Sequence, residues 1–392
     1  MAQTYKFGNG TWANKEGSTL AYSDTNNAFK PLPFSFERDS IATRVNKEGL
    51  IEVVGKDIPR IDYTDSADGV LLLENSATNL YSYSNKSSEW LKTNWTTTDN
   101  YAISPDGTQN AFRAVSLNTS GILYQTATGS SGVNTLSVYA KSNTSTNQKF
   151  RFFGNGNTLT SDDFTVTNEW KRIEFSYTYS SVTAGIKGAS NELSDILFFG
   201  FQHEVNDFAT SYIPTSGSSV PRAAETANGS GNSEVFNDSE GVLFADISAL
   251  DSESTNKMIT ISNGSNSTRI LIRYVGTTLL AQLRISGANQ YEFFYDPTNI
   301  KDNFKIAFKY KANDFNFFVN GFELDSSNSG STFSDGTLTE LAFDDGGGGN
   351  DFYGKTKELG YYDTALTDEE LEYITSYRSL NELVTELNLN TL

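Results

Sequence analysis

Apolar and polar side chains alternate over long stretches of the chain, which is the pattern of strands with one buried face and one wet face. The clearest run is residues 170–179, whose apolar side chains are Trp170, Ile173, Phe175, Tyr177 and Tyr179. Residues 196–201 are almost uniformly apolar and favour the centre of a sheet. Short strands at fairly even spacing, separated by turn-forming residues, predict a β-sandwich or jelly roll.

The strand pattern falls into two regions. The first runs over residues 76–222 and the second over residues 240–378. Between them, residues 223–239 are mostly small and polar, which is typical of an interdomain linker. We therefore predict an all-β protein with two tandem antiparallel β-sandwiches.

The N-terminal region carries a weaker pattern. Residues 1–75 contain short extended stretches and two prolines, Pro31 and Pro33, but too little continuous apolar pattern for a core of their own. We predict an extended N-terminal anchor that lies against another surface, either a neighbouring copy or the body that carries the protein.

Helical signals are confined to the C-terminal end. Thr367 and Glu370 have the spacing of a capping box, and Ser379 with Glu382 repeats it. Residues 379–392 are predicted to be a short helical tail that serves packing or self-association.

Composition and charge narrow the class of partner. The 27 Phe and 20 Tyr residues favour strands. The 29 basic and 48 acidic residues give a formal net charge of −19. Because so acidic a surface repels phosphate backbones and anionic headgroups, we predict no nucleic-acid partner and no membrane insertion.

The absence of cysteine excludes thiol nucleophiles, zinc–thiolate sites and disulfides. No apolar run approaches the roughly 18 residues of a membrane helix. Residues 1–10 also lack the basic-then-apolar pattern of a signal peptide. An extracellular-looking architecture without an export signal fits a virus particle, made in the host cytoplasm and released by lysis.

Signatures of catalysis are missing from the sequence. His203 is the one histidine, and no Gly-x-Ser-x-Gly elbow supplies a nucleophile for it. The Glu-x-Asp-x-x-Glu strand of concanavalin-like glucanases is also absent. We therefore predict no catalytic residue and no enzyme. An acid pair without a signature remains possible in so acidic a chain, so a hydrolase stays open as an alternative.

Two sets of residues are candidates for ligand binding. Acidic side chains flank the glycine run at 346–349 and could offer oxygen ligands to Ca²⁺; these are Asp344, Asp345 and Asp351. The alternative for them is a solvated acidic loop. Aromatic side chains that could stack on a sugar ring are Trp90, Trp95, Tyr101, Tyr291 and Tyr353. The alternative for each aromatic residue is a place in a core.

Three stretches resemble known families. The run Phe34-x-Phe36-x-Arg38, with Pro59-Arg60-Ile61 and Leu73-Glu74 after it, resembles the leader of many phage structural proteins. The phrase at 209–215, Ala-Thr-Ser-Tyr-Ile-Pro-Thr, together with residues 220–224, is similar to a jelly-roll module of the carbohydrate-binding type. Asn320-Gly321 and the stretch 359–371 are similar to the end of concanavalin A-like, laminin-G-type sandwiches.

These resemblances imply a bacteriophage virion protein without enzymatic activity. It would be a capsid- or tail-attached fibre or decoration protein at the virion surface, held to other virion proteins by residues 1–75. Its jelly roll and its laminin-G-like sandwich would serve adhesion to glycans or to the host surface. A homo-oligomer is expected, with a trimer as the first model. The alternatives are a purely structural capsid decoration or cementing protein, a polysaccharide depolymerase, and a bacterial surface adhesin.

Overall fold

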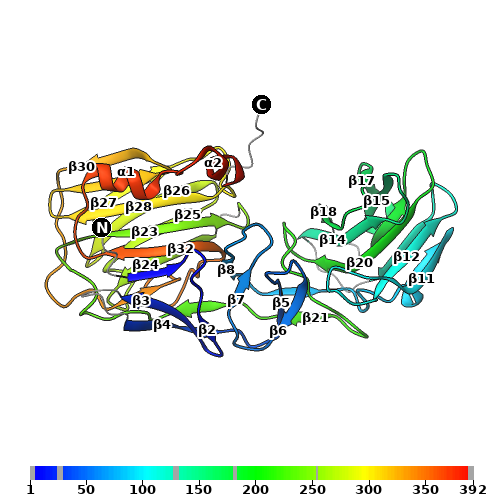
Figure 1. Cartoon of the computed structure of the whole chain (residues 1–392), viewed down its shortest axis with the longest axis horizontal. Helices are drawn as coiled ribbons and strands as arrows, with labels where there is room; N and C mark the ends of the chain where they lie inside the picture. Colours follow the sequence, from blue (N-terminus) through cyan, green and yellow to red (C-terminus); the bar gives the residue numbers. More distant parts are fainter. Residues whose placement is uncertain (1–4, 24–29, 127–131, 180–182, 253–254, 387–392) are drawn as a thin grey trace. The chain divides into compact units, whose positions relative to one another are not determined.

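A computed structural model describes residues 5–23, 30–126, 132–179, 183–252 and 255–386. Strands dominate these residues and the pairings between named strands are antiparallel, which confirms the all-β prediction. The chain forms two compact units (Figure 1). Unit 1 consists of Met1–Arg38, Lys56–Asn75 and Glu225–Leu392, and unit 2 consists of Asp39–Gly55 and Ser76–Ala224. The two sandwiches are therefore nested, with unit 2 inserted into unit 1, and not tandem as predicted.

Unit 1 is a sandwich of a large sheet and a five-stranded sheet. The path of the large sheet is β22-β4-β3-β1-β32-β23-β28-β29-β30, and β2 (Asn14–Lys15), β7 (Arg60–Asp62) and β8 (Val70–Leu73) join it at the side. Its path strands are β1 (Tyr5–Gly8), β3 (Ser18–Ser23), β4 (Lys30–Glu37), β22 (Thr226–Asn228), β23 (Glu240–Ala249), β28 (Phe304–Lys311), β29 (Phe315–Val319), β30 (Phe322–Ser327) and β32 (Gly354–Tyr362). The second sheet has the order β27-β26-β25-β24-β31. Its strands are β24 (Asn256–Ser262), β25 (Arg269–Val275), β26 (Thr278–Ile285), β27 (Ala288–Tyr295) and β31 (Glu340–Ala342). Apolar side chains from both sheets form one core, as alternation along each strand requires.

The predicted N-terminal anchor is part of this sandwich. Strand β1 pairs with β32, with Tyr5 opposite Tyr361 and Phe7 opposite Leu359. Phe34 and the other aromatic side chains of β1 and β4 are buried in the core of unit 1. The short apolar pattern of residues 1–75 could not show this, because these strands complete a core supplied mainly by residues far along the chain. Strand β1 also pairs with what would otherwise be an exposed edge of the sheet.

The predicted linker at residues 223–239 is also folded. Strand β22 pairs with β4, with Ala227 opposite Phe36. Ala227, Val235 and Phe236 lie in the core of unit 1. The small residues of this segment, which suggested a flexible connection, allow a strand to pack closely here.

A buried group of four charged side chains joins the three segments of unit 1. Arg38 lies at the end of the first segment, Arg60 and Glu74 lie in the second, and Glu225 begins the third. Arg38 Nη1 lies 2.7 Å from Glu225 Oε1, and Arg60 Nη2 lies 2.9 Å from Glu74 Oε2. Arg60 Nε also donates to Glu225 Oε1 at 2.8 Å. The charged group thus holds together the points where the chain leaves unit 1 and returns to it.

Unit 2 is the second sandwich. One sheet has the order β11-β12-β20-β14-β18, and the other has the order β10-β13-β19-β15-β16 with β17 beside β15. The strands of the first sheet are β11 (Trp95–Ala102), β12 (Ala111–Ser116), β14 (Gly132–Ser142), β18 (Lys171–Tyr179) and β20 (Asp195–Glu204). Those of the second are β10 (Leu91–Thr93), β13 (Ile122–Thr126), β15 (Gln148–Gly154), β16 (Leu159–Thr160), β17 (Phe164–Val166) and β19 (Thr183–Gly188). Strand β20 is central, as its uniformly apolar sequence predicted.

Two small strand pairs complete unit 2. Strand β9 (Ala77–Asn79) pairs with β21 (Val220–Arg222), where the chain enters and leaves the sandwich. The hairpin of β5 (Ala42–Val45) and β6 (Ile51–Val54) packs Ile51 against Phe199 and Tyr212. Residues 39–55, predicted as part of the anchor, therefore cover the outer surface of unit 2.

The helices are short. Helix α1 (Asp368–Thr375) begins with the predicted capping box: Glu370 N donates to Thr367 Oγ1, and Thr367 N donates to Glu370 Oε2. Helix α2 (Leu380–Glu386) follows, and Glu382 N donates to Ser379 Oγ at 3.1 Å. Residues 387–392 of the predicted tail lie outside the described residues. Neither helix has the length or the apolar character needed to cross a membrane.

Candidate functional site

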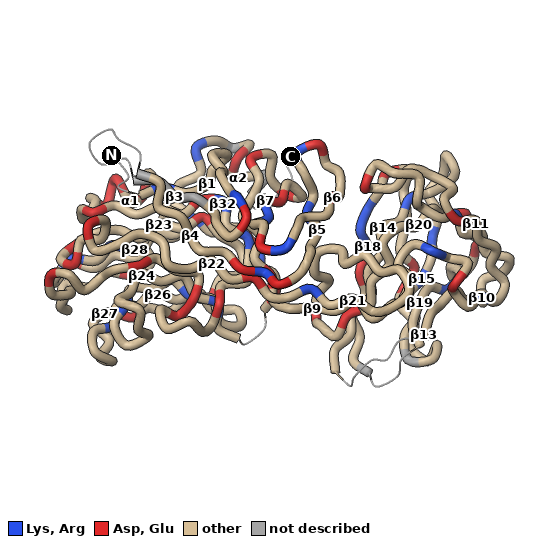
Figure 2. The backbone as a smooth tube through the Cα atoms, turned by 90° about the horizontal axis from the view of Figure 1, so that it is seen from below, with Lys and Arg blue, Asp and Glu red and all other residues tan. Residues whose placement is uncertain are grey.

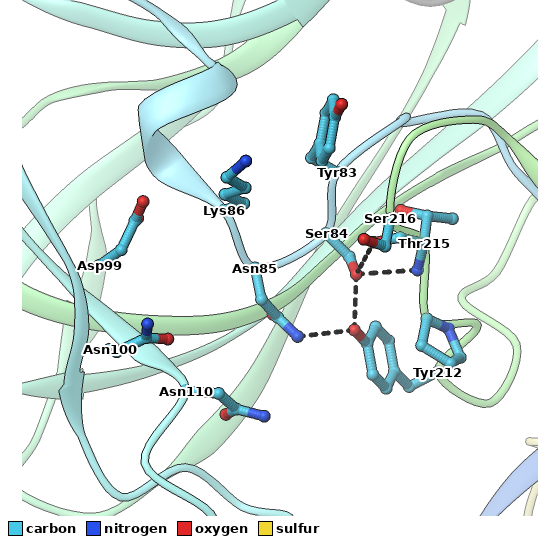
Figure 3. A pocket seen from close by; sticks show the side chains of 11 residues that line it. Tyr83, Ser84, Asn85, Lys86, Asp99, Asn100, Asn110, Tyr212, Thr215 and Ser216 are labelled. Carbon is cyan, nitrogen blue, oxygen red and sulfur yellow. Dashed lines mark hydrogen bonds between the residues drawn. The ribbon is translucent and has the colours of Figure 1, made fainter.

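A polar pocket lies in unit 2 between loops of the sandwich (Figure 3). Its volume is about 430 Å³, which is within the usual range for small-molecule sites. Three parts of the chain form it: the loop before the short 3₁₀ helix η2 (Ser87–Glu89), the end of β11 with the residue before β12, and the loop after β20. The lining residues are Tyr83, Ser84, Asn85, Lys86, Asp99, Asn100, Asn110, Tyr212, Pro214, Thr215 and Ser216.

Hydrogen bonds fix one wall of the pocket. Tyr212 Oη lies 2.6 Å from Ser84 Oγ and accepts a hydrogen bond from Asn85 Nδ2 at 2.9 Å (Figure 3). Thr215 N donates to Ser84 Oγ at 3.0 Å, which ties the two loops together. Burial raises the pKa of Tyr212, so its phenol stays protonated and remains a hydrogen-bond donor at neutral pH. This wall is therefore held in place before any ligand binds.

The backbone of Tyr83 is anchored from beneath. Trp90 Nε1 donates to the carbonyl oxygen of Tyr83 at 2.9 Å, and Gln125 Nε2 donates to the same oxygen at 2.6 Å. The backbone N–H of Tyr83 in turn donates to Gln125 Oε1 at 3.2 Å. The half-buried ring of Tyr83 is thus set at the pocket by two buried side chains that do not line it.

The charged groups of the pocket are compensated. Lys86 Nζ lies 2.8 Å from Glu89 Oε1, and the ammonium sits 5.6 Å from the centre of the Tyr83 ring. Burial alone would raise the pKa of Asp99, but hydrogen bonds from Ser87 and Ser88 outweigh burial and hold that pKa below its usual value. Asp99 is therefore ionised at neutral pH. The pocket thus offers no unbalanced positive charge.

Two polar atoms of the lining residues lack a partner in the part of the chain that is described. These are Asn110 Oδ1 and Thr215 Oγ1, both removed from solvent. The Nδ2 group of Asn110 donates to Asp106 Oδ2 at 2.7 Å, which orients the amide. Because buried polar groups are nearly always hydrogen-bonded, these two acceptors mark a place for a donor such as a water or a ligand hydroxyl.

Among the predicted sugar-binding residues of unit 2, only one is exposed. Trp90 and Trp95 are buried in the core of the sandwich, so their prediction as stacking surfaces is wrong. Tyr101 is 42% exposed on β11, beside the guanidinium of Arg113, but it does not line the pocket. The alternative prediction for Trp90 and Trp95, a place in the core, is confirmed, because both side chains pack between the two sheets of unit 2.

The predicted aromatic residues of unit 1 are not brought together. Tyr291 is buried, with its ring stacked on Phe308 and Phe315. It is therefore a core residue and not a sugar-binding one. Tyr353 is half-buried, and its hydroxyl donates to Asp351 Oδ2 at 3.2 Å.

The predicted calcium ligands order the glycine loop. Asp344 Oδ1 accepts a hydrogen bond from Gly346 N at 2.6 Å, and Asp345 Oδ1 accepts one from Gly347 N at 2.8 Å. Burial raises the pKa of Asp344 and of Asp351, which disfavours their charged forms. No three acidic or histidine side chains in the described ranges are placed so that they could hold a metal ion, which gives the Ca²⁺ prediction no support.

One stretch of the sequence indicated the place of the pocket, although its residues were not predicted to bind a ligand. The phrase at 209–215, quoted for its resemblance to carbohydrate-binding modules, contains Tyr212, Pro214 and Thr215 of the lining. The amides Asn85, Asn100 and Asn110 had no such signal, because asparagine is common throughout the chain.

Comparisons with known proteins found similar structures but no related sequence. Neither a protein-family model nor a curated protein matches the chain. The carbohydrate-binding module CBM40 of the Ruminococcus gnavus IT-sialidase is 15% identical over 38% of this chain and 94% of that chain, with a TM-score of 0.32. The same module has been solved with α2,3-sialyllactose bound.

Two further solved structures are similar at the same level. A leech intramolecular trans-sialidase is 16% identical over 36% of this chain and 24% of that chain, with a TM-score of 0.31. The receptor binding domain of a botulinum neurotoxin, mosaic serotype C/D, is 12% identical over 38% of this chain and 39% of that chain, with a TM-score of 0.31. Because these TM-scores are low, the assignment of two sandwich folds rests on the strand topology described above and not on these similarities.

Proposed function

We propose that this chain is a non-enzymatic adhesion protein of a bacteriophage virion and that the pocket of unit 2 binds a neutral sugar. The observation that carries the sugar-binding part is the lining of the pocket. It combines amide, hydroxyl and carboxylate groups with the rings of Tyr83 and Tyr212. Sugars present hydroxyl groups at their edges and C–H groups on their faces, and such a lining matches both.

The charges favour a neutral sugar over an acidic one. Lys86 is paired with Glu89, and Asp99 is held ionised nearby. No arginine is among the lining residues that the structure describes, so a bidentate partner for a ligand carboxylate is missing from this site. An anionic sugar would meet at least as much negative as positive charge here.

Binding of neutral oligosaccharides by the full chain tests this proposal. Replacing Tyr83 with alanine removes one wall of the pocket, and we expect at least tenfold weaker binding, or about 1.4 kcal/mol. Calorimetry or a glycan array with neutral and sialylated probes measures it. Tyr101→Ala is the matched control, because Tyr101 is an exposed tyrosine of the same unit outside the pocket.

The outcomes separate the pocket from the other candidates. Loss of binding with Tyr101→Ala but not with Tyr83→Ala would move the site to the outer part of β11. Silence across neutral and sialylated glycans would favour the structural alternative, a decoration or cementing protein without a ligand. Shortening of a polysaccharide during the incubation would favour a depolymerase.

The virion setting is supported by the resemblance of residues 34–80 to the leader of many phage structural proteins. Because residues 5–23 and 30–38 belong to the unit 1 sandwich, attachment to other virion proteins would use the outer surface of unit 1 and not a free arm. Several copies, with a trimer as the first model, would add avidity to weak sugar binding. Labelling the protein in intact particles and locating it by electron microscopy tests the setting.

A further inference from the structure

Three arginines share the outer face of the five-stranded sheet in unit 1. Strand alternation places the inward side chains of β25 and β26, such as Ile270 and Leu283, in the core. The outward positions are therefore Arg269, Leu271 and Arg273 on β25, and they include Leu280, Gln282 and Arg284 on β26. Figure 2 shows basic and acidic positions close together near β24 and β26.

The arginines lie close enough to repel one another. Arg269 and Arg284 are direct partners in the register of β25 and β26, and like charges in directly opposite positions destabilise a sheet. Burial lowers the pKa of Arg269 and the charges of Arg284 and Arg273 lower it further, while the carboxylates of Asp345 and Asp344 raise it in part. Burial also lowers the pKa of Arg273. The three arginines thus repel one another, and the carboxylates of Glu292, Asp344 and Asp345 offset part of this repulsion.

None of the three forms an ion pair with a residue that the structure describes. Arg269 donates to the carbonyl oxygen of Asp345, and Arg284 donates to Asn289 Oδ1 at 3.0 Å. The Nε groups of Arg269 and Arg273 are removed from solvent and have no hydrogen-bond partner among the described residues. Guanidinium groups in this state are ready to accept an anionic partner, and a small local shift would bring their Nε groups into contact with it.

Other side chains of the same face suit a sugar. Phe294 on β27 is 53% exposed and lies opposite Leu280 in the sheet register, so it offers a flat apolar surface. Gln282 is opposite Glu292, to which it donates at 2.5 Å, and its Oε1 atom has no partner within the described chain. A carboxylate and an amide oxygen beside an exposed ring are acceptors for sugar hydroxyls.

We propose that this outer face, defined by Arg269, Arg273, Gln282, Arg284 and Phe294, is a second ligand site that binds a carboxylate-bearing pyranose. The carboxylate pairs with Arg273 and Arg284, the two half-buried arginines, and relieves their repulsion. The sugar ring lies toward Phe294, and Glu292 accepts its hydroxyls. This site differs from the unit 2 pocket in charge and in ligand, and it does not depend on that pocket.

Binding of oligogalacturonate to the full chain tests the proposal, with the methyl-esterified form and inorganic sulfate as comparison probes. The ester keeps the sugar but removes its charge, and sulfate keeps a charge but has no sugar. We expect oligogalacturonate to bind at least tenfold more tightly than either. Arg273→Gln should weaken its binding at least tenfold, and Arg378→Gln, the same change at an exposed arginine of unit 1, should leave it unchanged.

Thermal unfolding shows whether the variant remains folded. Because the Nε group of Arg273 is buried without a hydrogen-bond partner among the described residues, Arg273→Gln should have a melting temperature equal to or above that of the parent protein. If it does not fold, Arg284→Gln serves in its place with the same expected loss of binding. In the parent protein, oligogalacturonate should raise the melting temperature, and this rise should vanish in the variant.

Three outcomes would overturn the proposal. Equal affinity for sulfate and oligogalacturonate would reduce the face to a general anion site. Equal affinity for the ester would remove the role of the carboxylate. Binding that survives Arg273→Gln but is lost with Tyr83→Ala would place the ligand in the unit 2 pocket, which would leave sugar binding by unit 2 intact and this inference wrong.

Discussion

Replacing Glu225 with glutamine is expected to lower the free energy of unfolding of unit 1 by about 3–5 kcal/mol, the usual cost of removing one partner from a buried ion pair. The Glu225 side chain is fully buried and contacts both Arg38 and Arg60. It also accepts a hydrogen bond from the backbone N–H of Glu74 at 2.9 Å. Glutamine keeps the shape but removes the charge, so the two buried guanidinium groups of Arg38 and Arg60 would lose the carboxylate that they share.

The loss should be felt where the three segments of unit 1 meet. Native-state hydrogen exchange of peptides from β4 and β22 should become faster, because these strands flank Arg38 and Glu225. The same change at Glu240 is the matched control. Glu240 Oε2 lies 2.7 Å from Lys311 Nζ, and the Lys311 side chain is 50% exposed. We expect Glu240→Gln to cost between 0 and about 1 kcal/mol. A loss below 1 kcal/mol for Glu225→Gln would contradict the role given to this charged group.

The partners in the buried charged group could not be predicted from the sequence. Arg38, Arg60 and Glu74 all stand in the run that resembles phage leaders. Their partner Glu225 lies 187 residues from Arg38, in a segment whose small residues predicted a linker. Local pattern identifies strands because alternation is a local property, but it carries no information about pairing at this separation.

The nesting of the two units was hidden for the same reason. Strand β1 pairs with β32, near the other end of the chain, and no local feature of residues 5–8 indicates that partner. The hairpin of β5 and β6 belongs to unit 2, where Ile51 packs, although the segments before and after it in the sequence belong to unit 1. The existence of the strands and the helix caps could therefore be predicted, and the domain boundaries could not.

The residues of the pocket could not be predicted from the sequence for a different reason. The sequence predicted that aromatic residues would stack on a sugar. Trp90 and Trp95 are instead buried in the core, where their large apolar surface stabilises the sandwich. Trp90 still contributes to the pocket, through its hydrogen bond to the Tyr83 carbonyl. The residues that line the pocket are mostly short polar side chains on loops. Only their positions in the fold distinguish them from the many similar residues elsewhere.

The stability of unit 2 is expected to fall with acid because of His203. Its ring lies in the sandwich core between Tyr81 and Tyr177, so it is a structural residue and not a surface one. Its Nε2 atom is 3.1 Å from Asn134 Oδ1. Its Nδ1 atom is buried and has no partner among the described residues, so a proton there would be an unpaired buried charge. Burial therefore lowers the pKa of His203 from 6.5 to about 4.

The direction of the pH effect follows from this depressed pKa. Between pH 6.5 and pH 4 the unfolded chain binds a proton at His203 and the folded unit does not, so lowering the pH favours unfolding. The stabilisation is complete above pH 6.5 and is lost as the pH falls to about 4. A shift from 6.5 to about 4 corresponds to about 3 kcal/mol. Tyr81 and Tyr177, the titratable groups in contact with the ring, stay neutral over this range because burial raises their pKa values.

Comparison with His203→Gln isolates this contribution from the 48 acidic residues, many of which also titrate near pH 4. Denaturant unfolding at pH 7 and pH 4 can be followed by tryptophan fluorescence, since Trp90, Trp95 and Trp170 belong to unit 2 and only Trp12 to unit 1. We expect the stability of the parent relative to the variant to drop by about 3 kcal/mol between the two pH values. The acidic residues contribute equally to both proteins and cancel in this difference. A difference that stays constant with pH would mean that His203 accepts a proton as easily in the folded unit as in the unfolded chain, which its burial without a partner for Nδ1 does not allow.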